Sequence, residues 1–192
     1  MRHSRLSGNI HKFSGTGEVN CYLILEEGDA IMIDTGDPED RDALRNAIEK
    51  IIALDKVKKV ILTHLHYDHS GNAALFPEAN IFISAEELDY FRKDAYGAVL
   101  NSAAVRELKS IRLRPLPAKI GRLRIIHTQG HTLGAVCIAH ESEKVLFTGD
   151  TFFGKGMYGR TDLPSSAPEK LAKSLERIRK YKDFTLAPGH DY

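Results

Sequence analysis

The stretch "ILTHLHYDHSGN" at residues 61–72 concentrates metal-binding side chains at one place in the chain. Three histidines and an aspartate lie within six positions: His64, His66, Asp68 and His69. In an extended backbone His64 and His66 project from one face, and Asp68 and His69 follow where the strand turns. Two such pairs suit two adjacent ions with shared ligands better than one tetrahedral ion. Imidazole and carboxylate together favour zinc, iron or manganese over magnesium or calcium.

The segments on either side of this stretch form a weak internal repeat. Residues 21–38, "CYLILEEGDAIMIDTGDP", and residues 135–152, "AVCIAHESEKVLFTGDTF", each predict two apolar strands joined by a charged turn, followed by Thr-Gly-Asp. Each is followed by apolar residues at helical spacing. A short strand then ends at a histidine, which is His64 in one half and His190 in the other.

The two helices of the repeat carry start signals. The first, at residues 38–51, has Asp37 as its expected cap and Pro38 at the first helical position. The second, at residues 166–181, has Ser166 as its expected N-cap. Two such halves, packed sheet against sheet with the helices outside, predict an α/β fold. We expect a four-layer αββα sandwich with residues 1–192 as a single domain. The histidine-bearing strand ends would then face one cleft at an edge of the sandwich.

The segment between the halves predicts elements outside the repeat. Residues 84–110 are charged and helical in pattern, and we expect two helices that cover the cleft. Residues 111–126 alternate apolar and basic side chains, which is typical of half-exposed strands. We interpret their basic residues as a solvated sheet face rather than an anion-binding patch: Arg112, Arg114, Lys119, Arg122 and Arg124.

Composition excludes several classes of partner. The chain has 192 residues, 42% of them hydrophobic, and a formal net charge of +1, so it lacks the basic surface typical of nucleic-acid or membrane binding. We find no secretory signal in the first residues and no apolar run of the roughly 20 residues that span a bilayer. Cys21 and Cys137 lie in apolar runs, as buried free thiols do. We therefore expect a cytoplasmic protein with a small-molecule substrate.

Three further motifs complete a resemblance to a known family. "THLHYDH" (63–69), "TQGHT" (128–132), "FTGDT" (147–151) and "APGH" (187–190), in that order, resemble the metal-binding motifs of the metallo-β-lactamase-fold superfamily. "MIDTG" at residues 32–36 resembles the early aspartate motif of that superfamily. The resemblance runs from about residue 20 to the end of the chain. It implies the four-layer sandwich with a dinuclear site at one edge.

The resemblance implies a role for each motif residue. The first metal would be held by His64, His66 and His131, and the second by Asp68, His69 and His190. Asp150 would bridge both metals, and Asp34 would support the ligands. We expect two divalent ions, zinc foremost, with iron or manganese as alternatives. A hydroxide bridging them would attack the substrate, with Asp68 and Asp150 as the catalytic carboxylates. The remaining histidines match no motif and are expected to be structural or exposed: His3, His11, His127 and His140.

Within the superfamily, the glyoxalase II-like group is the most similar. "GDTFFGKGMYGRTDLP" at residues 149–164 resembles the loop after the bridging aspartate of that group. Arg160 and Tyr192 fall where glyoxalase II contacts glutathione, and Lys155 and Tyr158 are weaker candidates in the same loop. The resemblance implies a hydrolase of anionic thioesters such as acyl-glutathione. Asp162 departs from the pattern, because glyoxalase II has an aromatic residue there.

The end of the chain is a second departure from the glyoxalase II pattern. The chain stops two residues after His190, whereas glyoxalase II has a helical C-terminal domain that completes its glutathione site. A ligand so near a chain end requires either an anchored last strand or a longer natural chain.

Other readings stay open. "GRTD" and "HDY" also occur in persulfide dioxygenases, which hold one iron with residues matching His64, His131 and Asp150. Lactone or phosphoester hydrolysis and metal binding without catalysis are further alternatives. β-Lactam hydrolysis is disfavoured, because zinc β-lactamases often have cysteine in place of Asp150. The acyl group, the thiol carrier, the metal and the oligomeric state are left undetermined by the sequence.

Overall fold

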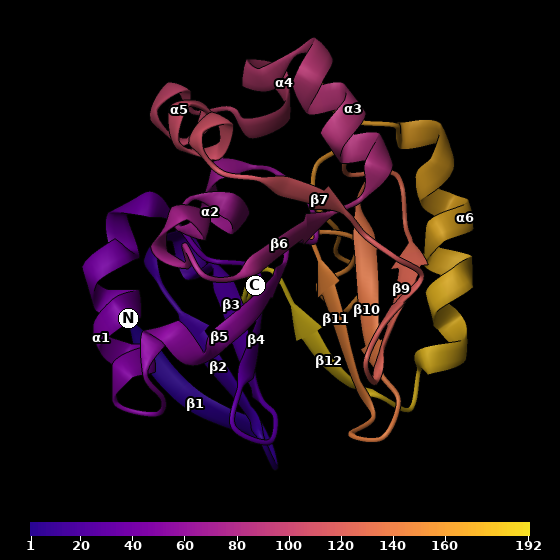
Figure 1. Ribbon diagram of the computed structural model, residues 1–192. Helices are drawn as coiled ribbons and strands as arrows, with labels where there is room; N and C mark the ends of the chain where they lie inside the picture. Colours follow the sequence, from indigo (N-terminus) through magenta and orange to yellow (C-terminus); the bar gives the residue numbers. More distant parts are fainter.

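The computed structural model describes residues 1–192 and contains two β-sheets (Figure 1). The seven-stranded sheet follows chain order: β1 (Arg2–Ser7), β2 (Ile10–Ser14), β3 (Asn20–Leu25), β4 (Ala30–Ile33), β5 (Val57–Ile61), β6 (Asn80–Ile83) and β7 (Leu113–Pro115). The five-stranded sheet has the order β12-β11-β10-β9-β8: β8 (Lys119–Ile120), β9 (Leu123–His127), β10 (Val136–His140), β11 (Val145–Gly149) and β12 (Thr185–Pro188).

Six α-helices connect and cover the sheets: α1 (Arg41–Glu49), α2 (Tyr67–Ser70), α3 (Ala85–Lys93), α4 (Ala95–Val99), α5 (Ser102–Ser110) and α6 (Pro168–Ile178). In Figure 1, α1 and α6 lie on opposite outer sides of the pair of sheets. No helix combines the length and the apolar character that a membrane span requires.

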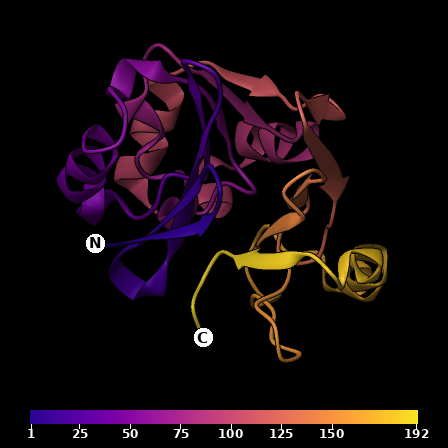
Figure 2. The ribbon, with the colours of Figure 1, turned by 90° about the horizontal axis from the view of Figure 1, so that it is seen from below.

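Three buried clusters separate four layers. The largest packs the seven-stranded sheet against α1, through Leu44, and against the helical segment α3–α5. The second fills the space between the sheets and contains Ile33 of β4 and Phe147 of β11. The third joins Leu146 of β11 to Ile178 of α6. Leu146 and Phe147 enter different clusters because neighbouring strand residues point to opposite faces. The predicted αββα sandwich is confirmed, and Figure 2 shows α6 end-on beside the five-stranded sheet.

The two halves share one topology, as the repeat predicts. In the first half β3 pairs antiparallel with β4, which pairs parallel with β5 after the crossover through α1. In the second half β10 pairs antiparallel with β11, which pairs parallel with β12 after α6. His64 and His190 follow β5 and β12 and so lie at equivalent positions.

Of the two residues predicted to cap helices, Asp37 does act as a cap and Ser166 does not. Asp37 is a cap, because its carboxylate accepts a hydrogen bond from Glu39 N, but it starts a 3-10 turn (Pro38–Asp40) that precedes α1. The prediction for Ser166 is wrong: α6 has Ala167 at its N-cap, with no side-chain cap bond. Pro168 lacks an N–H and has its φ fixed by its ring, which reduces the need for a capping acceptor.

The segment between the halves differs from the expectation in one respect. Residues 84–110 form three helices rather than two, because Asp94 and Asn101 each break the helical run and cap the next helix. Residues 111–126 form short strands as predicted, with β7 in one sheet and β8 and β9 in the other. Four of their five basic residues are exposed and Arg114 is half-buried, as expected for a solvated face.

Both cysteines are buried and free. Burial raises the pKa of both thiols, that of Cys137 to about 11. At neutral pH each is therefore a protonated, unreactive core residue, as the sequence indicates.

Candidate metal centre

The motif residues converge from strand ends of both sheets. His64 and His66 lie in the loop after β5, and Asp68 and His69 lie in α2. The other three follow the carboxyl ends of β9, β11 and β12 and are His131, Asp150 and His190. Polar groups at the carboxyl ends of strands gather at one edge of an α/β sandwich. All seven side chains therefore meet at the edge where the two sheets approach.

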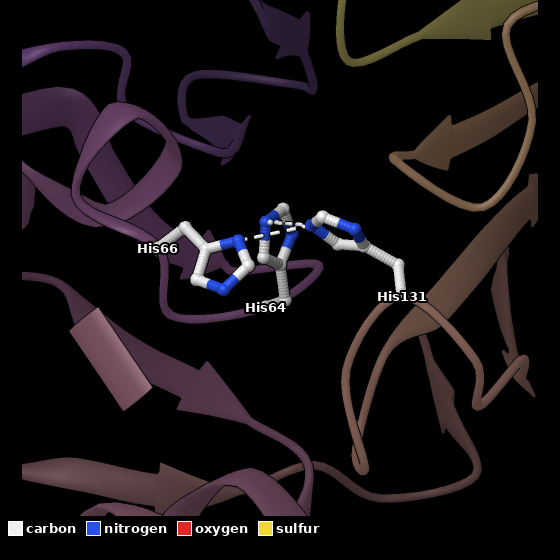
Figure 3. A group of neighbouring side chains, drawn as sticks. All are labelled: His64, His66 and His131. Carbon is white, nitrogen blue, oxygen red and sulfur yellow. Dashed lines mark hydrogen bonds between the residues drawn. The ribbon is translucent and has the colours of Figure 1, made fainter. Parts of the chain in front are cut away.

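The first group consists of three histidines, drawn in Figure 3. The Nε2 atom of His131 lies 2.9 Å from Nδ1 of His66 and 3.3 Å from Nε2 of His64. All three rings are at most 4% exposed. Three ring nitrogens of neighbouring histidines thus face one point, an arrangement that one metal ion would satisfy.

The second group consists of Asp68, His69 and His190. Oδ2 of Asp68 lies 3.4 Å from Nε2 of His190 and 3.9 Å from Nε2 of His69. The carboxylate of Asp150 lies between the two groups: Oδ1 is 3.1 Å from Nε2 of His69, and Oδ2 is 3.5 Å from Nε2 of His131. This is the position of a carboxylate shared by two ions.

The ring nitrogens that face away from the centre have partners that fix the tautomers. Nδ1 of His131 contacts the backbone oxygen of Arg160 at 2.7 Å, and Nδ1 of His190 contacts that of Gly17 at 3.1 Å. Because a carbonyl oxygen only accepts, these outer nitrogens carry the proton and the inner nitrogens keep a lone pair. Nε2 of His66 lies more loosely, 3.4 Å from Oγ of Ser165.

Asp34 orients the other two rings. Its carboxylate accepts from Thr63 N at 2.7 Å and from Thr63 Oγ1 at 2.8 Å, and Nδ1 of His69 donates to it at 2.9 Å. Since the Thr63 hydroxyl donates to Asp34, it is free to accept from Nδ1 of His64, 3.1 Å away. Asp34 has a left-handed backbone with φ of 55°, a conformation that aspartate tolerates better than most residues. The structure thus brings Asp34 to the position expected of a supporting residue.

The protonation chemistry fits divalent cations. Burial and the neighbouring histidines lower the pKa of His64 and His66, that of His66 to about 3. Burial alone would raise the pKa of Asp150, but the surrounding histidines outweigh it and lower that pKa. Neutral imidazoles and an ionised carboxylate are the forms that bind metal, and the three-histidine group and Asp150 have these forms. In the second group burial alone would lower the pKa of His69 and His190, but the carboxylates of Asp68 and Asp150 outweigh it and raise both pKa values, so a metal ion would displace a proton there.

Two buried atoms at the centre also lack a hydrogen-bond partner, namely Nε2 of His69 and Oδ1 of Asp150. An ion would satisfy both atoms, so the residues fit a dinuclear metal centre.

A cavity of about 380 Å³ opens beside the centre. It is reached by three of the four expected substrate residues, Tyr158, Arg160 and Tyr192. Lys155 does not line it, because it lies in the turn Gly154–Met157 with a left-handed backbone. The guanidinium of Arg160 is exposed and bound in parallel to both carboxylate oxygens of Asp162, each at 2.8 Å.

Five further residues line the cavity that were not among the sequence-predicted site residues: Tyr67, Leu100, Phe153, Gly159 and Leu163. All except Leu100 lie within the motifs at residues 63–69 and 149–164, and this position is the signal that could have found them. Leu100 follows α4, so the helical segment does border the cleft as expected. The histidines outside the motifs take no part in the centre. His3 and His11 stack on each other, His127 is exposed and His140 is buried in β10.

Comparison with known proteins identifies the family. A sequence model of the Metallo-beta-lactamase superfamily matches residues 14–190, which include all seven metal-site residues. The chain belongs to the metallo-beta-lactamase superfamily. A probable metallo-hydrolase of Methanocaldococcus jannaschii is 32% identical over 196 residues, covering 94% of this chain and 92% of that protein. The chain is thus a member of a superfamily of metallo-hydrolases and has a candidate dinuclear metal site.

Two other relatives bear on substrate and metal. A hydroxyacylglutathione hydrolase of Francisella tularensis subsp. novicida is 30% identical over 176 residues, which cover 89% of this chain. The matched region spans only 62% of that enzyme's length. Among solved structures, a superfamily protein in a di-iron-bound form is 26% identical with a TM-score of 0.73, covering 94% of this chain and 92% of that one.

Proposed function

We propose that this superfamily member hydrolyses an anionic acyl thioester, with an acyl-glutathione as the first candidate. The observation that supports the proposal is a group of seven side chains able to bind metal, beside a cavity with aromatic walls and an arginine. The similarity to a hydroxyacylglutathione hydrolase supports the substrate class. Because the chain spans less than two thirds of that enzyme, its substrate is proposed here on the residues of this chain.

The residues of the centre have distinct tasks in this reaction. Two divalent ions held there would lower the pKa of a water molecule between them and polarise the thioester carbonyl. Asp150 fixes the separation of the two ligand groups. Asp68 is the ligand carboxylate most open to the cavity, with 22% of its side chain exposed. We assign to Asp68, which starts ionised, the acceptance of the proton that the attacking water loses as the C–O bond forms, and its transfer to the departing sulfur as the C–S bond breaks.

The cavity walls bind and orient the substrate. Tyr67, Phe153 and Tyr158 offer apolar surface to an acyl group and exclude water from it. Arg160 offers charged donors to a carboxylate of the thiol carrier, after exchange of its present partner Asp162. The contact of Arg160 with His131 is made by its backbone oxygen, so replacing the Arg160 side chain should leave His131 in place.

Kinetics on an acyl-glutathione test the proposal. Asp150→Ala should abolish both hydrolysis and metal retention, because Asp150 belongs to both ligand groups. Arg160→Ala should raise KM by about tenfold with metal content unchanged, as for loss of one charged hydrogen-bond pair. Asp162→Asn should lower KM by releasing the guanidinium. Absence of thiol release from any acyl-glutathione, with both metals present, would contradict the substrate class. Unchanged kinetics in both surface variants would remove Arg160 from the site.

An iron-dependent persulfide dioxygenase is the second candidate. The observation that favours it is the structural similarity to a protein in a di-iron-bound form, since the same ligands bind zinc or iron. Oxygen uptake on glutathione persulfide distinguishes it from the hydrolase. A panel of lactones and phosphoesters tests the remaining hydrolytic alternatives.

A further inference from the structure

Glu87 is a buried carboxylate outside the set of metal ligands. It lies in the first turn of α3, in the helical segment between the two halves, and its side chain is 0% exposed. Burial raises the pKa of Glu87, and no cationic side chain lies near enough to offset that effect. An unpaired buried carboxylate destabilises a fold unless hydrogen bonds compensate, so its partners are informative.

The partners of Glu87 are the backbones of two metal-site loops. Oε2 accepts from Leu65 N at 3.1 Å, and Oε1 accepts from Gly134 N at 3.0 Å. Leu65 lies between the ligands His64 and His66, and Gly134 follows the ligand His131 by three residues. One rigid carboxylate thus joins the two loops that supply the first metal group, one from each half of the molecule.

The start of α3 reinforces this contact. Ser84 and Glu87 have the spacing of a capping box, in which the glutamate would normally bond back to the N-cap backbone. Here Ser84 Oγ accepts from Glu87 N at 3.2 Å and donates to the backbone oxygen of Gly134 at 2.6 Å. A Cβ at Gly134 would lie 2.4 Å from Glu87 N, so only glycine permits this approach. The helix start is therefore built against the His131 loop.

We propose that Glu87 is a positioning residue that sets the separation of the His64–His66 loop and the His131 loop, and thereby the affinity of the three-histidine site. Both oxygens accept N–H groups, so the ionised form matches the geometry. No hydrogen bond joins Glu87 to Asp68, His69 or His190. The helix α2 is linked to it only through bonds of His69 and Ser70 to the Leu65–His66 backbone, so the second metal group depends on Glu87 less directly than the first. The inference rests on the proposed metal centre but not on the proposed substrate.

Hydrogen exchange of backbone amides in the metal-free wild-type protein tests the contacts of Glu87 without a mutation. Because one carboxylate holds both groups, the amides of Leu65 and Gly134 should be protected from hydrogen exchange to a similar degree. Rapid exchange of either amide in the folded protein would overturn the proposal.

Glu87→Gln then tests the consequence for metal binding, with Glu86→Gln as the matched control on the exposed side of the same helix turn. The amide group keeps one acceptor but turns a donor toward the other N–H. One of the two backbone amides should exchange about tenfold faster, as for loss of one hydrogen bond. Zinc affinity at the three-histidine site should fall by about 10–100-fold, followed by the imidazole ¹⁵N signals of His64, His66 and His131. The signals of His69 and His190 should report a smaller loss of affinity than those of the three histidines.

The outcomes separate the two proposals. If the wild-type protein bound zinc at neither of the two groups, the proposed metal centre itself would be refuted. Normal zinc binding by wild type with equal losses at both groups in Glu87→Gln would show a general structural role and overturn the positioning role. Zinc affinities in Glu87→Gln equal to those of the wild-type protein would also overturn the positioning role.

Discussion

At the scale of single residues, glycine allows the two metal groups to approach each other. Gly189 precedes the ligand His190 and passes directly beside the centre. A Cβ at this position would lie 2.3 Å from Oδ1 of Asp150 and 2.7 Å from Cε1 of His69. Both neighbours are buried and His69 is bonded to Asp34, so neither has room to move away.

Gly189→Ala should therefore displace the shared carboxylate. We expect loss of at least half of the bound metal in purified protein, with a loss of activity that follows the metal content. Gly8→Ala is the matched control, because its Cβ would meet only an ordinary contact 3.4 Å from Glu143. Neither glycine has a left-handed backbone, so the comparison isolates the clash. Full metal content in Gly189→Ala would show that the carboxylate adapts.

The sequence reveals ligands more readily than the groups that orient them. Residue type and spacing suggest His64, Asp150 and the other candidate ligands, because few side chains bind metals, and the structure brings these side chains together. Thr63 contacts Asp34, which lies 29 residues away in sequence. Glu87 contacts the backbone N–H groups of Leu65 and Gly134, 22 and 47 residues away. Such contacts depend on the packed fold, so residue type alone does not indicate them.

At the scale of elements, apolar periodicity predicts the repeated strands and helices but not the boundaries of the helical segment. The pattern of residues 84–110 predicts two helices, whereas Asp94 and Asn101 divide the segment into three. Ser166 illustrates the limit at a helix start. Its hydroxyl donates to the backbone oxygen of the ligand His131 at 2.8 Å, and therefore does not cap α6. Local capping rules fail where a tertiary partner competes for the same side chain.

At the scale of the whole molecule, the seven-stranded sheet anchors the segment after β12 that carries His190. The backbone N–H of Asn20 at the start of β3 donates to the oxygen of Gly189 at 2.7 Å, and the Tyr22 hydroxyl donates to that of Pro188 at 2.6 Å. Lys12 pairs with Asp191 at 2.6 Å. The segment that carries His190 is thus anchored to the seven-stranded sheet.

Removal of one of these contacts between the sheets should lower the metal affinity of the second group. Tyr22→Phe deletes a hydroxyl that is buried between the sheets, and we expect a loss of about 1 kcal/mol in the free energy of unfolding. Zinc affinity at the group with His190 should fall, while the three-histidine group keeps its affinity. Tyr96→Phe is the control, since Tyr96 is exposed. Equal zinc affinities in both variants would contradict the role of the inter-sheet contact.

The central claim is that both halves of the sandwich together hold two metal ions for thioester hydrolysis. Elemental analysis of protein purified without added metal, combined with thiol release from an acyl-glutathione, tests it most directly. We expect about two divalent ions per chain, with zinc as the main metal, and loss of activity on chelation that zinc restores. One iron per chain with oxygen uptake on glutathione persulfide, or full hydrolysis by metal-free protein, would contradict it.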